Sequence, residues 1–182
     1  MNEKELIEKC KSGDKSAYKK LYETYSKYAK SICFRYIGDE MLAEDVLHDG
    51  FIKVFVSIQS FQYRGDGSLK AWLSRIFFIE SLNFLKKNKI WNMTVSIDDY
   101  DIQEEEIDIS LLETIPKEVL MQYISGLSAG YRIVFNMYMF ENIPHKEIGK
   151  QLGITEEASR SRLSRAKAIL LKQLQDFILK NE

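Results

Sequence analysis

The sequence predicts an all-α protein in which two helical domains are joined by an acidic linker. Its 182 residues include 2 Pro and 9 Gly, which leaves long uninterrupted stretches of helix-forming residues. No strand-like alternation bounded by tight turns stands out. The hydrophobic content of 45% excludes wholesale disorder, so a packed core must exist.

The distribution of charge along the chain predicts the domain organisation. Residues 1–92 carry 16 basic and 12 acidic side chains, residues 93–118 carry one and nine, and residues 119–182 carry nine and six. Two mildly basic halves therefore flank an acidic segment without sustained periodicity, which is typical of a linker. We expect domains over residues 1–92 and 116–182, with the linker over 93–115.

Start and stop signals in the first half predict four helices. They are a short helix over Glu3–Lys11, a segment from Lys15 closed by Gly38, a helix after Asp39, and a helix from about Leu69 to Lys89. Asp14, Asp39 and Ser68 are the expected N-caps. Leu42 begins the apolar stripe of the third helix. The fourth includes Ile79 among its apolar residues and Trp72, which we interpret as core.

The second half predicts four more helices. Pro116 suits the first turn of one, Ser128 is the expected cap of a helix over Ala129–Phe140, Pro144 opens a short helix ending at Leu152–Gly153, and the last runs from about Glu156 to Leu179. A short helix, a turn containing Gly and a longer helix form a helix-turn-helix arrangement.

The last helix has two different faces. Its predicted buried side contains Ser159, Leu163, Ala166 and Leu170. The other side and its flanks carry groups that can contact DNA bases and phosphates: Glu157, Ala158, Arg160, Ser161, Arg162, Ser164 and Arg165. The alternative is an ordinary solvated basic face.

The helix after Asp39 has an acidic, partly apolar outward face. Burial of Leu47, Phe51 and Val54 leaves Asp45, His48, Asp49 and Ile52 on the other side. Such a face suits a basic partner, although a solvated acidic surface is the alternative.

Three stretches carry a family resemblance. AEDVLHDGFIKVF and FQYRGDGSLKAWLSRIFFIESLNFLKKNK resemble region 2 of the extracytoplasmic-function (ECF) sigma factors of the sigma-70 family, and LSAGYRIVFNMYMFENIPHKEIGKQLGITEEASRSRLSRAKAIL resembles their region 4. The resemblance implies a sigma factor that binds core RNA polymerase and directs promoter-specific transcription initiation. It implies that the second domain reads the minus-35 duplex.

The resemblance also implies roles for two sets of residues in the first domain. The polymerase clamp coiled coil would dock on Glu44, Asp45, His48, Asp49 and Ile52; the family usually has Gln at the position of His48. The melted minus-10 strand would meet a basic and polar set with an aromatic member, which suits single-stranded DNA: Gln62, Tyr63, Arg64, Lys70, Ser74, Asn83, Lys86 and Lys87. The base preference stays open, because similar proteins usually carry Asn where Ile79 stands and often Asp at Asn83.

Several alternatives stay open at this point. The acidic linker could be a solvated tether or could occupy a basic channel for nucleic acid. A helix-turn-helix regulator with an unrelated N-terminal module is the second hypothesis. An enzyme is the third, because Asp45 and His48 are three residues apart, as in helical metal sites; the only other histidine, His145, lies in the other half.

The remaining expectations concern chemistry, partners and location. We expect no enzymatic activity, no metal and no cofactor, since no phosphate loop, nucleophile elbow or paired-cysteine motif appears. Cys10 and Cys33 are expected to be reduced. No apolar run approaches the roughly 20 residues that span a bilayer, so we expect a cytoplasmic protein without membrane insertion. The family resemblance adds an anti-sigma factor as a partner.

Overall fold

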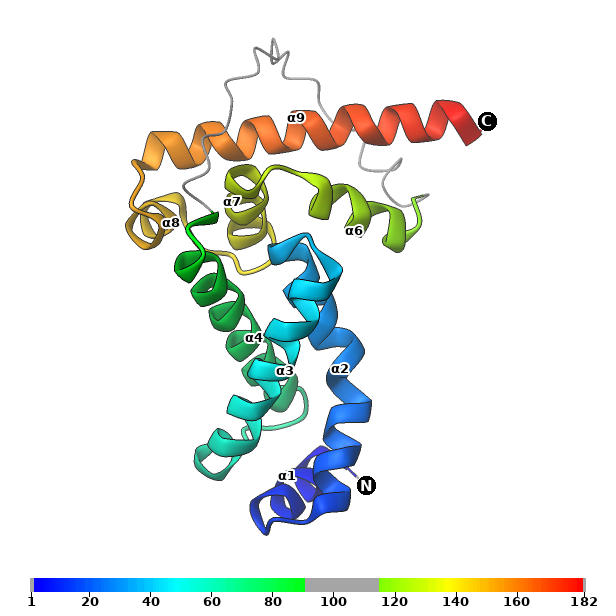
Figure 1. Ribbon diagram of the computed structural model, residues 1–182, viewed down its shortest axis with the longest axis vertical. Helices are drawn as coiled ribbons and strands as arrows, with labels where there is room; N and C mark the ends of the chain where they lie inside the picture. The colour runs from blue at the N-terminus through cyan, green and yellow to red at the C-terminus, as the bar shows by residue number, and fades with distance from the viewer. Residues whose placement is uncertain (1, 91–114, 182) are drawn as a thin grey trace. The chain divides into compact units, whose positions relative to one another are not determined.

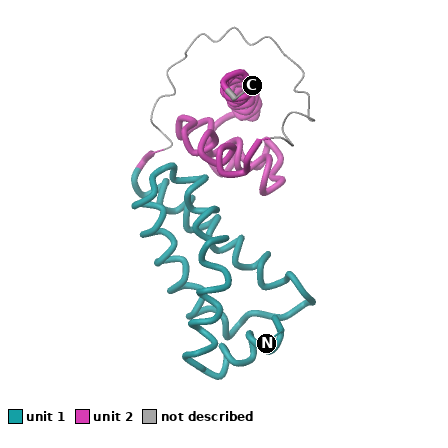
Figure 2. Tube along the Cα trace, turned by 90° about the vertical axis from the view of Figure 1, so that its right-hand side faces the viewer, with its two compact units in different colours: residues 1–88 teal, residues 89–182 magenta. Residues whose placement is uncertain are grey.

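The protein consists of two compact helical units. A computed structural model describes residues 2–90 and 115–181, and the chain divides into unit 1, Met1–Asn88, and unit 2, Lys89–Glu182 (Figure 2). All regular elements in the described residues are helical, which confirms the all-α prediction. Nearly all of the expected linker, residues 93–114, lies outside the described residues.

Unit 1 contains four α-helices and one short 3-10 helix (Figure 1). They are α1 (Glu3–Lys11), α2 (Lys15–Ile37), α3 (Glu40–Ser57), η1 (Ile58–Ser60) and α4 (Ser68–Lys87). Helices α2, α3 and α4 pack pairwise on one another, while α1 packs against α2 and η1.

Two of the expected N-caps are confirmed. The Asp14 carboxylate accepts hydrogen bonds from the backbone N–H groups of Ser16 at 2.7 Å and Ala17 at 3.3 Å. The Asp39 carboxylate accepts one from Leu42 at 2.9 Å. Each satisfies a donor that has no partner within its own helix.

Of the other two expected caps, Ser68 is wrong and Ser128 is confirmed in its position only. Ser68 is the first residue of α4, and the N-cap position belongs to Gly67, which has no side chain to accept a bond. Ser128 does occupy the N-cap of α7, but its side chain makes no capping hydrogen bond. Its carbonyl begins that helix by accepting from Tyr131 at 3.0 Å and Arg132 at 2.9 Å.

Aromatic rings fill the interior of unit 1. The Phe51 ring lies 5.1 Å from the Phe77 ring, and Tyr36 lies 5.6 Å from Phe78, measured between ring centroids. These residues come from α2, α3 and α4, so they join the three long helices. Burial of each such ring stabilises the fold by about 1.5–3 kcal/mol.

One apolar residue differs from expectation: Leu42, expected in the apolar stripe of the third helix, is exposed. Ile79 is also exposed, at 38%. The buried side of α4 contains residues such as Leu73 and Phe77, and Ile79 lies outside this side. Trp72 is half-buried, with its ring 4.9 Å from that of Phe61, so it is a partly covered core residue.

Both cysteines are free and buried, as expected of reduced structural thiols. Burial is the main cause that raises the pKa of Cys10 to about 11 and that of Cys33 to about 12. Neither thiol forms appreciable thiolate near neutral pH.

The described residues of unit 2 form four helices, with the last lying across the others (Figure 1). They are α6 (Lys117–Gly126), α7 (Ala129–Met139), α8 (His145–Leu152) and α9 (Glu156–Asn181). A buried guanidinium closes the α6–α7 connection: Nη1 of Arg132 donates to the carbonyls of Ser125 at 2.7 Å and Leu127 at 2.6 Å. Burial lowers the pKa of Arg132 to about 10.

A methyl group at Gly50 should destabilise unit 1. An added Cβ would lie 2.4 Å from a ring carbon of Phe77, so Gly50→Ala forces apart α3 and α4. We expect a loss of roughly 1–3 kcal/mol in the free energy of unfolding, measured by urea denaturation of the full chain. Gly126→Ala is the control, since nothing lies within 4 Å of its Cβ. Equal stability of both variants would contradict the tight contact.

Candidate nucleic-acid interfaces

The turn between α8 and α9 sets the geometry of the helix-turn-helix. Gly153 adopts the left-handed conformation, with φ 67°, and its N–H bonds to the Gly149 carbonyl. Ile154 donates to the same carbonyl at 3.0 Å. A Cβ at Gly149 would come within 2.7 Å of the Ile154 carbonyl oxygen, so the turn packs directly on α8. Glycine is required at both positions.

A buried polar contact adds to the apolar packing between α8 and α9. His145 Nδ1 and Ser159 Oγ lie 2.9 Å apart, and the imidazole stacks on Tyr138 with ring centroids separated by 4.5 Å. The predicted inward side of α9 is buried: Ser159, Leu163, Ala166 and Leu170. The rotation of α9 about its axis is thereby fixed.

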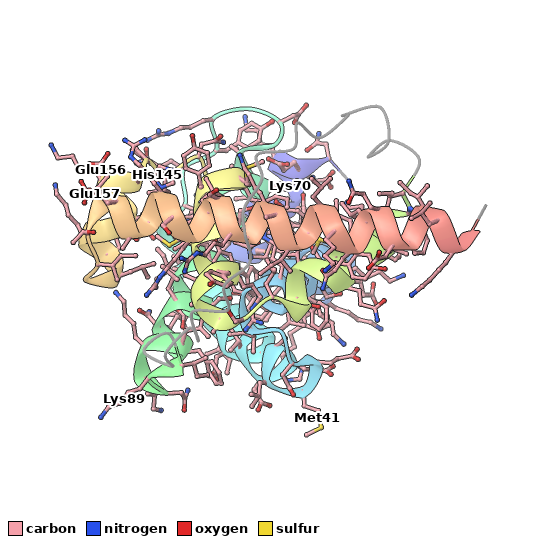
Figure 3. All side chains as sticks on the ribbon, turned by 90° about the horizontal axis from the view of Figure 1, so that it is seen from above. Met41, Lys70, Lys89, His145, Glu156 and Glu157 are labelled. Atoms are coloured by element: carbon pink, nitrogen blue, oxygen red, sulfur yellow. The ribbon has the colours of Figure 1, made fainter. Side chains whose placement is uncertain are left out.

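The predicted reading residues lie on or beside the opposite side of α9. Glu157, Arg160, Ser161 and Ser164 are exposed, while Ala158, Arg162 and Arg165 are half-buried. Glu156 and Glu157 stand at the first turn (Figure 3).

The arginines of this face differ in their partners. The guanidinium of Arg160 forms an ion pair with Glu156 at 2.5 Å, a contact that the sequence did not predict. Arg162 and Arg165 make no ion pair with any residue that the structure describes. Because an exposed pair is worth at most about 1 kcal/mol, Arg160 can exchange its carboxylate for a phosphate.

The outward face of α3 combines acidic and apolar side chains. All five expected docking residues are exposed: Glu44, Asp45, His48, Asp49 and Ile52. Glu44 is 3.6 Å from Lys30 Nζ, so its charge is partly neutralised within unit 1.

Two apolar residues extend this face and were missed from the sequence. The two are Met41, which is 79% exposed, and Val56, which is 75% exposed; the expected Ile52 is 61% exposed. The Met41 side chain points away from the neighbouring helices (Figure 3). Residues 41, 45, 48, 52 and 56 recur at intervals of three or four, which is one helical stripe. That spacing was the available signal.

The loop before α4 is braced by its own polar groups. Gln62 and Arg64 are exposed, and the Tyr63 hydroxyl donates to Asp66 at 2.7 Å. That bond is the main cause that raises the pKa of Tyr63 to about 12, with smaller contributions from burial and from the charges of Asp66 and Glu3. The Tyr63 phenol therefore stays protonated near neutral pH.

The expected minus-10 residues of α4 form two groups. Lys70 is exposed over the ring of Tyr28 at 4.6 Å, and Ser74 shares a hydrogen bond with the Tyr28 hydroxyl. Asn83, Lys86 and Lys87 are exposed near the other end of the helix. The distance from residue 70 to residue 87 is roughly 25 Å along the axis, so these groups do not form one compact site.

One anchoring residue at this loop was also missed. Glu3, in the first turn of α1, accepts hydrogen bonds from the backbone where α4 begins. A lone glutamate 64 residues upstream of Gly67 gives no signal of this contact in the sequence.

The described residues offer no group of three or more His, Cys, Asp or Glu side chains able to hold a metal ion. Among the helices described, none is long and apolar enough to span a membrane.

Two family matches cover the regions just described. Residues 21–90 match Sigma-70 region 2, and residues 117–170 match Sigma-70, region 4. The chain belongs to the sigma-70 family. Promoter-specific transcription initiation by RNA polymerase is accordingly its function, and core polymerase and promoter DNA are the partners of this family. The match over 21–90 argues against a helix-turn-helix regulator with an unrelated N-terminal module.

Relatives over nearly the full length place this sigma factor among the ECF group. It is 25% identical to the ECF RNA polymerase sigma factor SigW of Bacillus subtilis, over 96% of this chain and 97% of the relative. It is also 25% identical to the RNA polymerase sigma-H factor of Pseudomonas aeruginosa, over 97% and 95%, and 24% identical to the ECF sigma-E factor of Haemophilus influenzae, over 98% of each.

Two solved structures are also similar to the sigma factor. One is CnrH in complex with the cytosolic domain of CnrY, at 20% identity and TM-score 0.46, covering 94% of this chain and 96% of that one. The other is RpoE in complex with the anti-sigma factor NepR from Bartonella quintana, at 18% identity and TM-score 0.46, covering 87% and 96%.

The stability of the sigma factor's unit 2 should fall in mild acid. Burial, with a smaller contribution from Arg160, lowers the pKa of His145 below its ordinary value of 6.5. The unfolded chain therefore binds this proton more tightly, so the stabilisation is present above about pH 6.5 and is lost as the pH falls through the folded pKa. We expect the unfolding temperature of unit 2 in the full chain to fall in that range.

Substitution identifies the group responsible. His145→Gln should remove this part of the pH dependence, measured by thermal unfolding between about pH 7.5 and 5, whereas His48→Gln should leave it intact because His48 is exposed. An unchanged pH profile in His145→Gln would assign the effect elsewhere.

Proposed function

We propose that the two units divide promoter recognition between them. Residues 1–92 form a region 2-like domain that binds core polymerase and the minus-10 element, and residues 116–182 form a region 4-like domain that binds the minus-35 duplex. The observation that carries the proposal is the orientation of α9, where Ser159 and Leu163 are buried. Arg165 lies on the other side and Arg162 flanks the buried stripe, both without carboxylate partners among the described residues.

The minus-35 duplex is proposed to meet the outward side of α9. Arg162 and Arg165 can donate to guanine edges in the major groove, where arginine makes bidentate contacts. Ser161, Ser164 and Arg160 suit phosphates. The full proposed set is Glu157, Ala158, Arg160, Ser161, Arg162, Ser164 and Arg165.

The minus-10 strand is proposed to meet the loop and outer side of α4. Gln62, Tyr63 and Arg64 would receive unpaired bases. The separation along α4 supports two roles, with Lys70 and Ser74 near the loop and Asn83, Lys86 and Lys87 tracking the backbone farther along. Ile79 is exposed between these groups and would present an apolar surface there.

The clamp coiled coil of core polymerase is proposed to dock on α3. Asp45 and Asp49 would meet basic side chains, and Ile52 would be covered. Met41 and Val56 extend the apolar part of this surface. Glu44 and His48 complete the set.

The remaining proposals concern chemistry, location and control. We propose that the sigma factor has no catalytic activity, because nucleotide addition belongs to the polymerase, and that it acts in the cytoplasm. We propose an anti-sigma factor as a further partner, as expected from the family. Residues 93–115 serve as the linker, and their charge suits either a tether or occupation of a basic channel.

Removal of the Arg165 guanidinium should weaken reading of the duplex. Arg165→Ala is expected to cost roughly 1–3 kcal/mol in minus-35 binding, because a base-reading contact is lost. Holoenzyme binding to duplex promoter fragments measures it, with unchanged affinity for core polymerase. Lys180→Ala, near the end of the same helix, is the control. Full promoter activity of Arg165→Ala in transcription assays would exclude Arg165 from the reading face.

Charge reversal on α3 should prevent assembly with polymerase. Asp45→Arg with Asp49→Arg is expected to weaken core binding by at least about tenfold, since cations would face basic side chains of the clamp. Pull-down and fluorescence titration with core enzyme measure this, with circular dichroism as the folding check. Glu8→Arg with Glu23→Arg is the control on exposed parts of α1 and α2. Unaltered pull-down by the α3 variant would refute the docking face.

A further inference from the structure

The carboxylate of Glu3 caps a helix to which it does not belong. Its Oε2 accepts the Gly67 N–H at 3.1 Å, and its Oε1 accepts the Leu69 N–H at 3.1 Å. The Ser68 hydroxyl donates to Oε1 at 3.5 Å. One side chain from α1 therefore satisfies two backbone donors at the start of α4.

No residue of α4 or its loop performs this task. Gly67 stands at the N-cap without a side chain, and Gly65 and Gly67 both have positive φ, at 116° and 87°. Glycines allow the loop this course but supply no side chain that could cap the helix. An anion at a helix N-terminus compensates both the unpaired N–H groups and the helix dipole.

Ser68 connects the cap to the loop backbone. Its oxygen accepts the Arg64 N–H at 3.3 Å while its hydroxyl donates to Glu3. The Ser68 N–H also bonds to the Gly65 carbonyl at 3.1 Å. Glu3 is therefore connected through Ser68 to the backbone of Arg64, one of the residues proposed to meet an unpaired base.

Helix α1 holds Glu3 in place. Asn2 caps it by accepting the Glu5 N–H at 2.8 Å, and Ile7 and Cys10 are buried. A second tie joins α1 to the chain before the loop, because Gln59 Nε2 donates to the Lys11 carbonyl at 2.7 Å. The cap is thus supplied by an element that is packed against the rest of unit 1.

We propose that Glu3 is a positioning residue for promoter melting, which holds the loop from Gln62 to Gly67 in the shape that receives the unpaired minus-10 strand. This inference rests on the proposed assignment of that loop to the minus-10 element. Glu3 itself acts through the backbone at Gly67 and Leu69, without contacting DNA.

The test substitutes Glu3 and measures strand binding by the holoenzyme. Glu3→Gln keeps the shape, but its single carbonyl oxygen cannot replace both acceptors and its charge is lost. The probe is a fluorescent single-stranded oligonucleotide carrying the minus-10 sequence of a promoter selected from a random library by the unmodified holoenzyme. Glu5→Gln is the matched control, since Glu5 lies in the same turn and pairs with Lys9 on the exposed side.

We expect Glu3→Gln to weaken strand binding about fivefold, the factor that corresponds to loss of a typical helix cap. Affinity for core polymerase and for the minus-35 duplex should not change. Ser68→Ala, which removes the connection without altering α1, should shift binding in the same direction. Discrimination between the selected sequence and a scrambled one should decrease in both variants.

The controls separate the possible failures. Arg64→Ala tests the loop assignment: reduced strand binding there with normal binding in Glu3→Gln would overturn the positioning role alone. Normal binding in both would overturn the minus-10 assignment together with this inference. A parallel loss of core and strand affinity in Glu3→Gln, with a lower unfolding temperature, would show a merely structural cap and overturn the proposal.

Discussion

The contact of α3 with α4 determines which surfaces of unit 1 can meet a partner. Phe77 lies so close to Gly50 that no side chain fits between them, and the Phe51 ring packs beside it. With this contact in place, α3 cannot rotate without separating the two helices. Asp45, Asp49 and Ile52 are consequently held outward, because burial of the opposite side leaves them no other orientation.

In unit 2 the packing likewise fixes the rotation of one helix, α9. A carbonyl at Gly149 accepts two N–H groups from the turn, and the His145–Ser159 contact lies next to the apolar stripe of α9. A buried polar pair strongly favours one rotation of α9 about its axis, because in any other rotation both groups would lose their hydrogen-bond partner in the interior. Arg162 and Arg165 thereby obtain their direction from buried residues outside the proposed reading set.

The sequence predicted what depends on local periodicity and left out what depends on long-range contacts. Helix α1 and the caps Asp14 and Asp39 follow from signals within a few residues. Ser68 satisfied the same local rule, yet α4 is capped by Glu3, whose position depends on how α1 packs. The exposed Ile79 illustrates a second limit. When apolar residues lie on several sides of a helix, periodicity alone cannot determine which of these sides packs against the other helices.

Internal ion pairs partly neutralise the charge of both proposed interfaces. Arg160 pairs with Glu156 on α9, and Glu44 pairs with Lys30 beside the proposed docking face, so part of the charge of each surface is already neutralised within the protein. Exposed pairs of this kind are weak, and a phosphate or a basic side chain can replace the internal partner at little cost. On the proposed assignments, binding therefore gains less from bulk charge than from groups without such partners among the described residues. These are Arg162 and Arg165 for the proposed minus-35 reading, and Asp45, Asp49 and the exposed Ile52 for the proposed polymerase docking.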